Sequence, residues 1–328
     1  MIEVRDVRLA LDGDLKTACA KKLRVPVGDV LEAALLRRSV DARRKDDVHF
    51  TVTAAVSLRR GEKKFSPYTP WTPPRVEVLK KKPALRPVVC GAGPAGLFAA
   101  LTLARAGAEP ILLERGSAVD ERKADVEKFY QTRALDTESN IQFGEGGAGT
   151  FSDGKLNTGT HDARIGFVLA EFAAHGAPEH ITYDAKPHIG TDVLVEVVQN
   201  LRREIIDRGG EVRFGHRVTG LSTQDGRITA LTVHSPDGEY TLPAQQVILA
   251  IGHSARDTFE MLHAQGVPME PKPFSMGVRI EHRQSDINTA QYGAAADRLP
   301  AADYSLSCHL PDGSSAYTFC MCPGGEVF

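Results

Sequence analysis

The stretch PVVCGAGPAGLFAALTLARAG, residues 87–107, decides the fold of this chain. An apolar run ends at Cys90, the glycine pattern GAGPAG follows over residues 91–96, and a run rich in alanine and leucine with helical spacing comes next. A second apolar run, ILLE, ends at Glu114, which lies 23 positions after Gly91 (114 minus 91). Strand, glycine turn, helix, strand and acid in this register predict a βαβ unit that binds a dinucleotide.

Each residue of this motif has a physical reason. Gly91 permits the tight turn, the missing Cβ of Gly93 lets a pyrophosphate approach the backbone, and Gly96 lets the helix pack closely on the strand. The start of the helix offers free N–H groups and a partial positive charge to phosphates. We expect Glu114 to hold the adenosine ribose and to disfavour a 2′-phosphate. Arg115 either lies over the adenine or is an exposed arginine at a strand end. The alternative of a turn without a ligand is less favoured, because every part of the motif is in register.

A second match to the pattern, GEGGAG at residues 144–149, is not expected to form a second loop of this kind. No convincing strand precedes it, and the TFSDGKL that follows begins with loop formers instead of an apolar helix. We therefore expect one dinucleotide fold, which argues against separate FAD and NADPH domains. The glycine-rich loop of residues 144–160 either brings backbone N–H groups close to phosphate oxygens or a flavin ring, or is a flexible surface loop.

The chain before this motif has the pattern of a small α+β domain. Residues 2–11 and 48–58 alternate as strands do, residues 15–23 have helical spacing, and residues 29–43 fit either a helix or a strand. A connector rich in proline and lysine follows, without periodicity.

After the motif, residues 162–175 and 191–208 have helical spacing and enclose a loop at residues 180–190. Residues 211–252 then predict a β-meander, with turn signals QDG and PDG, followed by a buried strand. Residues 266–328 mix short strands with loops.

Composition places the chain among globular proteins, with 328 residues of which 42% are apolar and 25% charged. Its apolar runs are far shorter than the ~20 residues of a membrane-spanning helix, and its first residues lack the features of a secretory signal. The five cysteines, an odd and scattered set, do not suggest a disulfide framework. We expect a soluble, cytoplasmic protein that does not bind membranes.

The net charge of −2 conceals an asymmetry. Residues 1–82 hold 19 Lys and Arg against 11 Asp and Glu, or +8, and the rest hold 21 against 31, or −10. This basic segment lacks an aromatic-rich RNA-binding motif. A solvated surface or an interdomain contact is therefore favoured over nucleic-acid binding.

The GAGPAG motif, Glu114 and the stretches GGEVRFGHRVTGL and VILAIGHSARD resemble the FAD-binding architecture of the glutathione-reductase superfamily, over residues 86–257. The resemblance implies that the strand ending near Val218 contacts the adenine through its backbone. It also implies that the turn from Ala250 to Gly252 returns the chain to the FAD domain.

More narrowly, SVDARRKDD, GEGGAGTFSDGKLNT, HIGTDVL, PFSMGVRIEH and FCMCPGG resemble a largely uncharacterised bacterial group of FAD-dependent dehydrogenases or oxidoreductases. The resemblance implies that the basic module is an extra domain of that group and that the segment from about Gly266 covers the flavin. Members of the architecture continue past CPGG, to a glycine-aspartate turn and a helix. We therefore expect a fragment, with weakened FAD binding.

The resemblance implies an α/β fold, with a Rossmann-like FAD-binding domain of glutathione-reductase type between a small α+β domain and the start of an α+β substrate domain. The expected parts are a basic α+β domain (residues 1–65), a Pro/Lys-rich linker (66–86), the FAD-binding domain with inserted helices and β-meander (87–262) and a partial substrate or cap domain (263–328). The expected FAD contacts are Gly91, Ala92, Gly93, Pro94, Ala95, Gly96, Glu114, Arg115, Gly147, Gly149, Thr150, Lys155, Val218, Ala250 and Gly252.

Catalytic side chains are hard to infer, because a flavin carries the redox chemistry itself. Lys155 is a candidate to stabilise a reduced-flavin anion, and His188, Arg279 and His282 are candidates to hold an anionic substrate or assist proton transfer. For each, a capping, ion-paired, core polar or solvated role is the commoner one. The CxC of Cys320 and Cys322 lacks the spacing of a redox disulfide and has no histidine pair nearby, so burial is expected and no metal site.

The leading hypothesis is a cytoplasmic FAD-dependent oxidoreductase, or dehydrogenase, in which hydride passes to or from flavin N5. Its partner would be a small-molecule substrate or electron donor, with NADH or NADPH as a candidate donor. One alternative is a tRNA-modifying flavoprotein that uses the basic module as an arm. The other is a non-catalytic FAD-binding or redox-sensing protein. The sequence predicts neither the substrate nor an oligomeric state.

Overall fold

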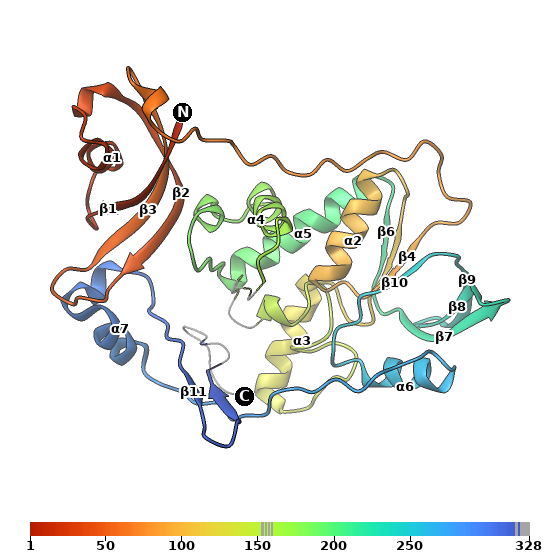
Figure 1. Cartoon of the computed structure of the whole chain (residues 1–328). Coiled ribbons are helices and arrows are strands. Elements are labelled where there is room, and N and C mark those ends of the chain that lie inside the picture. Colours follow the sequence, from red (N-terminus) through yellow and green to blue (C-terminus); the bar gives the residue numbers. More distant parts are fainter. Residues whose placement is uncertain (152–153, 155, 157, 159, 319–320, 322–328) are drawn as a thin grey trace.

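The computed structural model describes residues 1–151, 154, 156, 158, 160–318 and 321. Figure 1 shows three groups of elements along the chain. An antiparallel sheet at the N-terminus lies at one end, a parallel sheet covered by helices occupies the centre, and a second antiparallel sheet lies at the far end. This mixed α/β architecture agrees with the predicted fold class.

The central sheet has four parallel strands in the order β10-β4-β5-β6. They are β4 (Val88–Cys90), β5 (Ile111–Leu113), β6 (Glu211–Arg213) and β10 (Val247–Leu249). Helix α2 (Pro94–Arg105) connects β4 to β5 and completes the predicted βαβ unit. The helix begins three residues earlier than the apolar pattern indicated, because Pro94 occupies its first turn, where the fixed φ of proline suits a helix.

The last strand of this sheet corrects one prediction. The sequence predicted that β10 would be buried, but Ile248 and Leu249 are 40% and 42% exposed. The reason is the position of β10, which is an edge strand of the sheet and pairs only with β4 in the described structure.

Helices α4 (Arg164–Ala174) and α5 (Thr191–Asp207) match the predicted helices, and with α2 they form the largest apolar core. The short 3₁₀ helices η3 (Ala148–Phe151) and η4 (Glu179–Thr182) lie in the connections before them. Helix α3 (Val119–Thr132) was not predicted. Its sequence is mostly polar, and it buries little beyond Val119, Val126 and Arg122, so it has no clear apolar stripe.

The predicted meander consists of β7 (Arg217–Gln224), β8 (Arg227–Ser235) and β9 (Gly238–Pro243), which pair antiparallel in that order. The stretch EVRFGHRVTGL is two strands instead of one, since the chain turns at Gly215, with φ +69°, between β6 and β7. Val218 therefore lies at the start of β7 and not near the end of a strand. Helix α6 (Arg256–Ala264) then follows β10.

The N-terminal unit, residues 1–65, contains the sheet β1-β3-β2 and helix α1 (Leu15–Leu23). Its strands are β1 (Ile2–Leu9), β2 (Val30–Asp41) and β3 (His49–Leu58), with short 3₁₀ helices η1 (Val27–Asp29) and η2 (Glu62–Lys64) between and after them. The ambiguous residues 29–43 thus form a strand. Valines and other apolar residues of the three strands pack against α1 in a separate core.

The C-terminal segment contains α7 (Gln284–Tyr292), η5 (Gly293–Arg298) and a hairpin of β11 (Ser307–His309) and β12 (Ser315–Tyr317). Helix α7 was missed because it buries no residue of its own and so carries no apolar stripe. It lies beside the N-terminal unit in Figure 1, where Lys45 donates a hydrogen bond to the carbonyl oxygen of Gln291. No helix in the described part of the chain is long and apolar enough to cross a membrane.

A charged network holds the three helices of the main core together. Arg105 of α2 donates to the Glu171 carboxylate of α4 at 2.6 Å and to the Glu204 carboxylate of α5 at 2.8 Å. Nε2 of His175 lies 2.9 Å from the second oxygen of Glu204. The hydrogen bond from Arg105 lowers the pKa of Glu204 to about 2. Partly buried, bidentate pairs of this kind are stronger than exposed surface pairs.

We predict that Glu204→Gln lowers the free energy of unfolding by about 2 kcal/mol near pH 7, because Arg105 loses a charged acceptor. The folded pKa of Glu204 lies below its ordinary 4.5, so this contribution is complete above pH 4.5 and disappears as the pH falls towards about 2. Urea unfolding of both proteins should therefore show a difference that shrinks in acid. A difference that stays constant down to about pH 3 would contradict the role assigned to the carboxylate.

Candidate dinucleotide-binding site

Two glycines of the first loop are required by the packing of the chain itself. At Gly91, with φ +100°, a Cβ would lie 2.4 Å from the carbonyl oxygen of Ala250. At Gly96, a Cβ would lie 1.7 Å from the carbonyl oxygen of Gly91. Real Cβ atoms do not approach backbone so closely, so these positions hold strand β4, strand β10 and helix α2 in close contact.

Gly93 is different, because nothing in the described chain requires glycine there. Its φ of −69° and ψ of 179° are open to any residue, and the only described atom within 4 Å of an added Cβ is the Cα of Gly147, at 3.9 Å. The next two residues, Pro94 and Ala95, are exposed at the start of α2. The backbone thus keeps clear a space in front of a helix N-terminus, as a phosphate-binding loop requires.

The Glu114 carboxylate links three parts of the backbone. It is 5% exposed, and it accepts hydrogen bonds from the N–H groups of Ala92 at 2.7 Å, Gly116 at 2.9 Å and Gly144 at 3.0 Å. An ionised carboxylate has about four acceptor positions, so these donors leave about one for a further donor such as a ribose hydroxyl.

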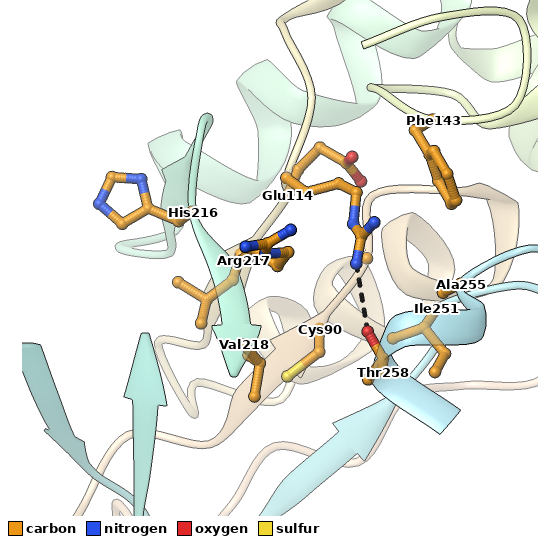
Figure 2. Close-up of a pocket in the computed structure, with 12 residues that line it drawn as sticks. Cys90, Glu114, Phe143, His216, Arg217, Val218, Ile251, Ala255 and Thr258 are labelled. Atoms are coloured by element: carbon orange, nitrogen blue, oxygen red, sulfur yellow. Dashed lines mark hydrogen bonds between the residues drawn. The ribbon is translucent and has the colours of Figure 1, made fainter. Parts of the chain in front are cut away.

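A pocket opens beside Glu114 at the carboxyl ends of β4 and β5, where parallel sheets of this kind bind ligands (Figure 2). Its lining combines the ends of these strands with the start of β7, the N-terminal part of α6 and the ring of Phe143. Val218, which is 7% exposed, contributes to its wall.

Arg115 also lines this pocket, and its side chain is only 11% exposed. Its guanidinium lies 4.7 Å from the centre of the Phe143 ring and donates to the Asp257 carboxylate at 2.8 Å and to Thr258 at 3.2 Å. The alternative of an exposed arginine at a strand end is therefore wrong. Its guanidinium is instead held by these contacts and lines the pocket next to Glu114.

The second glycine-rich loop packs against the first. The N–H of Gly146 donates to the carbonyl oxygen of Ala92 at 2.8 Å, and a Cβ on Gly147 would lie 3.2 Å from the Cα of Gly93. Gly144, Gly146 and Gly147 all have positive φ. In the described residues no strand directly precedes the pattern at residues 144–149, and its last residues lie in the short 3₁₀ helix η3 and not in an α-helix, which agrees with its rejection as a second βαβ motif. The loop nevertheless borders the space in front of Gly93.

Arg122, a residue that the sequence analysis missed, holds this second loop in place. Its side chain is fully buried and donates to five backbone carbonyl oxygens, at distances of 2.6 to 3.3 Å. These belong to Asn140, Ile141, Gly144, Glu145 and Gly147. Burial lowers the pKa of Arg122 to about 10, so it stays protonated at neutral pH. No local pattern signals this role, because Arg122 lies within an ordinary charged run.

Glu145 is the second buried charge that the sequence analysis missed. One of its oxygens accepts from the N–H of Val119 at 2.8 Å and from Arg202 at 2.9 Å. The other has no hydrogen-bond partner among the described residues, and the same holds for the hydroxyl of the buried Thr150. Burial raises the pKa of Glu145 to about 7. This side chain caps α3 from the second loop.

The other predicted site residues are spread more widely. Ala250 and Gly252 follow β10, Ala250 borders the first loop, and Gly149 lies in η3. His188, Arg279 and His282 are exposed, and His282 lies 2.8 Å from the hydroxyl of Tyr304. These three catalytic candidates are not among the described residues that line the pocket of Glu114.

Other predicted residues cannot be placed. Lys155, Cys320 and Cys322 lie outside the residues that the structure describes. Within the described ranges, no group of three or more histidine, cysteine, aspartate or glutamate side chains is arranged to hold a metal ion.

A glycine loop before a helix, a buried acid at the end of the next strand and a pocket at the sheet edge define a dinucleotide-binding α/β protein. Comparison with family models makes this specific. Residues 85–258 match the family described as FAD binding domain, and the chain belongs to this family. Residues 273–328 match the family described as FAD-dependent protein, C-terminal domain-like, and residues 1–57 match a domain of unknown function.

A curated relative from Clostridium beijerinckii, described as an uncharacterized protein, is 43% identical over 341 residues. The match covers 99% of this chain but 63% of the relative, so the chain spans less than two thirds of that protein.

Solved structures that resemble the chain do so weakly. The Thermovibrio ammonificans THI4 structure is 18% identical, with 56% of this chain and 64% of that chain covered and a TM-score of 0.37. The OxyS anhydrotetracycline hydroxylase from Streptomyces rimosus is 21% identical, with 54% and 33% covered and a TM-score of 0.30. Likeness at this level carries no conclusion about this chain.

The two glycines should respond differently to substitution by alanine. Gly96→Ala places a Cβ 1.7 Å from a backbone oxygen and should lower the free energy of unfolding by about 3 kcal/mol, because helix and strand must separate. Gly93→Ala, where the nearest described atom is 3.9 Å away, should change it by less than about 0.5 kcal/mol. Denaturant unfolding of both variants without added ligand tests this, and equal losses would contradict the assignment.

Proposed function

We propose that this chain binds FAD and acts as an oxidoreductase on a small-molecule substrate. The observation that supports this most directly is Gly93, a glycine that the packing of the described chain does not require. The space next to Gly93 lies at the exposed start of α2 and is bordered by Gly147 of the second glycine-rich loop. The match of residues 85–258 to the FAD binding domain family identifies the ligand class that suits this space.

Each part of the site has a proposed task. Backbone N–H groups at the start of α2 would bind the pyrophosphate, and the remaining acceptor position of Glu114 would bind the adenosine ribose. The pocket of Arg115 and Val218 would take the adenine. Because Glu114 is an acid, a 2′-phosphate at this place is disfavoured.

When bound, the flavin would supply the redox chemistry, in the form of hydride transfer at its N5 position. The chain would position the cofactor, and Arg122 would keep the second loop fixed beside it through its five carbonyl contacts. We assign no catalytic side chain, since His188, Arg279 and His282 lie exposed and away from the pocket lining.

Part of the positive charge of the N-terminal unit is already paired with carboxylates of the chain. Several of its arginines already pair with carboxylates, as Arg8 does with Asp47, Arg38 with Asp184 and Arg43 with Asp41. Paired guanidinium groups contribute less to phosphate binding than free ones. We therefore rank a tRNA-modifying flavoprotein below an oxidoreductase with a small-molecule substrate.

Binding of FAD to the wild-type chain and to Gly93→Ala, followed by flavin absorption, tests the proposal. The Cβ of Gly93→Ala would occupy part of the proposed pyrophosphate position. It should weaken FAD binding about 100-fold, or by about 3 kcal/mol, while the fold is retained. An unchanged dissociation constant would place the cofactor elsewhere, and a wild-type chain that does not bind FAD would refute the proposal for this chain.

Anaerobic addition of NADH or NADPH to the FAD-loaded chain separates an enzyme from a sensor. Bleaching of the flavin band by either nucleotide would support an oxidoreductase that uses this donor. If neither nucleotide nor any small-molecule donor reduces the flavin, the non-catalytic or redox-sensing alternative would be favoured.

A further inference from the structure

The edge of the N-terminal sheet is completed by a distant segment of the chain. Strand β2 is one of the two edge strands in the order β1-β3-β2. Arg38 donates its N–H to the carbonyl oxygen of Tyr183 at 2.7 Å, and its own carbonyl accepts from Ala185 at 2.8 Å. These bonds form a parallel bridge between Arg38 and Asp184. Sheet edges commonly pair with such segments, since their backbone groups are otherwise unpaired.

The Arg38 side chain reinforces this pairing. It donates two hydrogen bonds to the Asp184 carboxylate, at 2.7 and 3.0 Å, and both side chains are partly buried. The guanidinium lies 5.3 Å from the ring centres of both Phe50 and Tyr183. A bidentate pair next to two aromatic rings is geometrically fixed and stronger than an exposed ion pair.

The same segment then contacts the glycine-rich loop. We call residues 183–190 the bridging segment. At its far end, the N–H of Ile189 donates to the carbonyl oxygen of Gly154 at 2.9 Å, and the N–H of Leu156 donates to the carbonyl oxygen of Pro187 at 3.2 Å. A Cβ on Gly154 would lie 1.6 Å from the carbonyl oxygen of Ile189, so the two backbones are in direct contact.

The bridging segment also leads directly into α5. Gly190 is the N-cap residue of this helix, and Arg202 of the helix donates to the buried Glu145 carboxylate of the second glycine loop at 2.9 Å. The segment therefore contacts the N-terminal unit at one end, while its other end and the helix that follows contact the loop at Gly154 and Glu145.

We propose that the N-terminal unit positions the described part of the glycine-rich loop (residues 144–151, 154 and 156) through the bridging segment, with Arg38 and Asp184 as the positioning pair. The N-terminal unit then acts as a brace, by which we mean a support that holds this loop of the proposed cofactor site in place. The mechanical part of this proposal is independent of any ligand, and only its effect on FAD rests on the proposed function.

Amide hydrogen exchange of the full chain without FAD tests the brace. In Arg38→Met, peptides that contain Ala185, Leu156 and Ile189 should exchange about tenfold faster, because their hydrogen bonds open more often. Asp184→Asn should act in the same direction, and Arg38→Lys should recover part of the protection because it keeps the charge but loses the bidentate geometry. Arg8→Met, which removes an exposed pair with Asp47 in the same sheet, is the matched control and should leave these peptides unchanged.

Faster exchange at Ala185 with unchanged exchange at Leu156 and Ile189 would overturn the proposal, since the unit would then dock without positioning the loop. If peptides of β1 and β3 also exchange faster in Arg38→Met, the sheet itself has opened. The Asp184→Asn variant then tests the proposal, because the Asp184 side chain lies outside the sheet. No change at Leu156 and Ile189 in that variant would again overturn the brace.

The second readout is FAD affinity, which Arg38→Met and Asp184→Asn should lower about tenfold, or by about 1.4 kcal/mol each. Unchanged affinity in both variants would overturn the link from the brace to the cofactor. If the wild-type chain binds no FAD, the proposed function fails, while the exchange experiment still decides whether the brace exists.

Discussion

The structure of this site depends on one buried carboxylate. Glu114 lies at the end of the second strand of the βαβ unit. Its carboxylate accepts hydrogen bonds from N–H groups of the first glycine loop, of its own turn and of the second glycine loop. Without this acceptor, three buried backbone donors would lose their partner, which is costly because water has little access to Glu114, which is only 5% exposed. The acid at this position therefore stabilises the fold, and under the proposed function it would also bind the ligand.

The glycines around Glu114 have two roles: some allow close backbone packing, and one leaves space open for a ligand. Gly91 and Gly96 allow strand and helix backbones to touch, and Gly147 allows the second loop to approach Gly93. Gly93 itself has room for a side chain that the described chain leaves unused. Arg122 then fixes the second loop from behind through backbone carbonyls, so that both loops face the same space. A rigid, preformed cradle binds a phosphate without first having to be ordered.

Local patterns predicted the βαβ unit, the meander and helices α4 and α5, because their periodicity and turn residues lie within a few positions of one another. Contacts between residues far apart in the sequence could not be predicted from local patterns. Nothing near Arg122 reveals that it is buried against the second glycine loop, and nothing near Glu145 reveals that it caps α3 at Val119. The exposure of β10 followed from its place at the sheet edge, and the strand in residues 29–43 is fixed by its pairing with β3. The contact of Arg38 with Asp184, 146 positions apart, likewise has no local signal.

Under the proposed function, the pocket beside Glu114 would bind the adenosine half of FAD. Competition between FAD and two of its fragments, ADP and FMN, for the wild-type chain tests it most directly, with the bound flavin fluorescence as the measured quantity. We expect that ADP displaces FAD competitively and that FMN binds far more weakly than FAD. Displacement by FMN together with indifference to ADP would contradict it, because the recognition would then lie with the flavin half and not at Glu114.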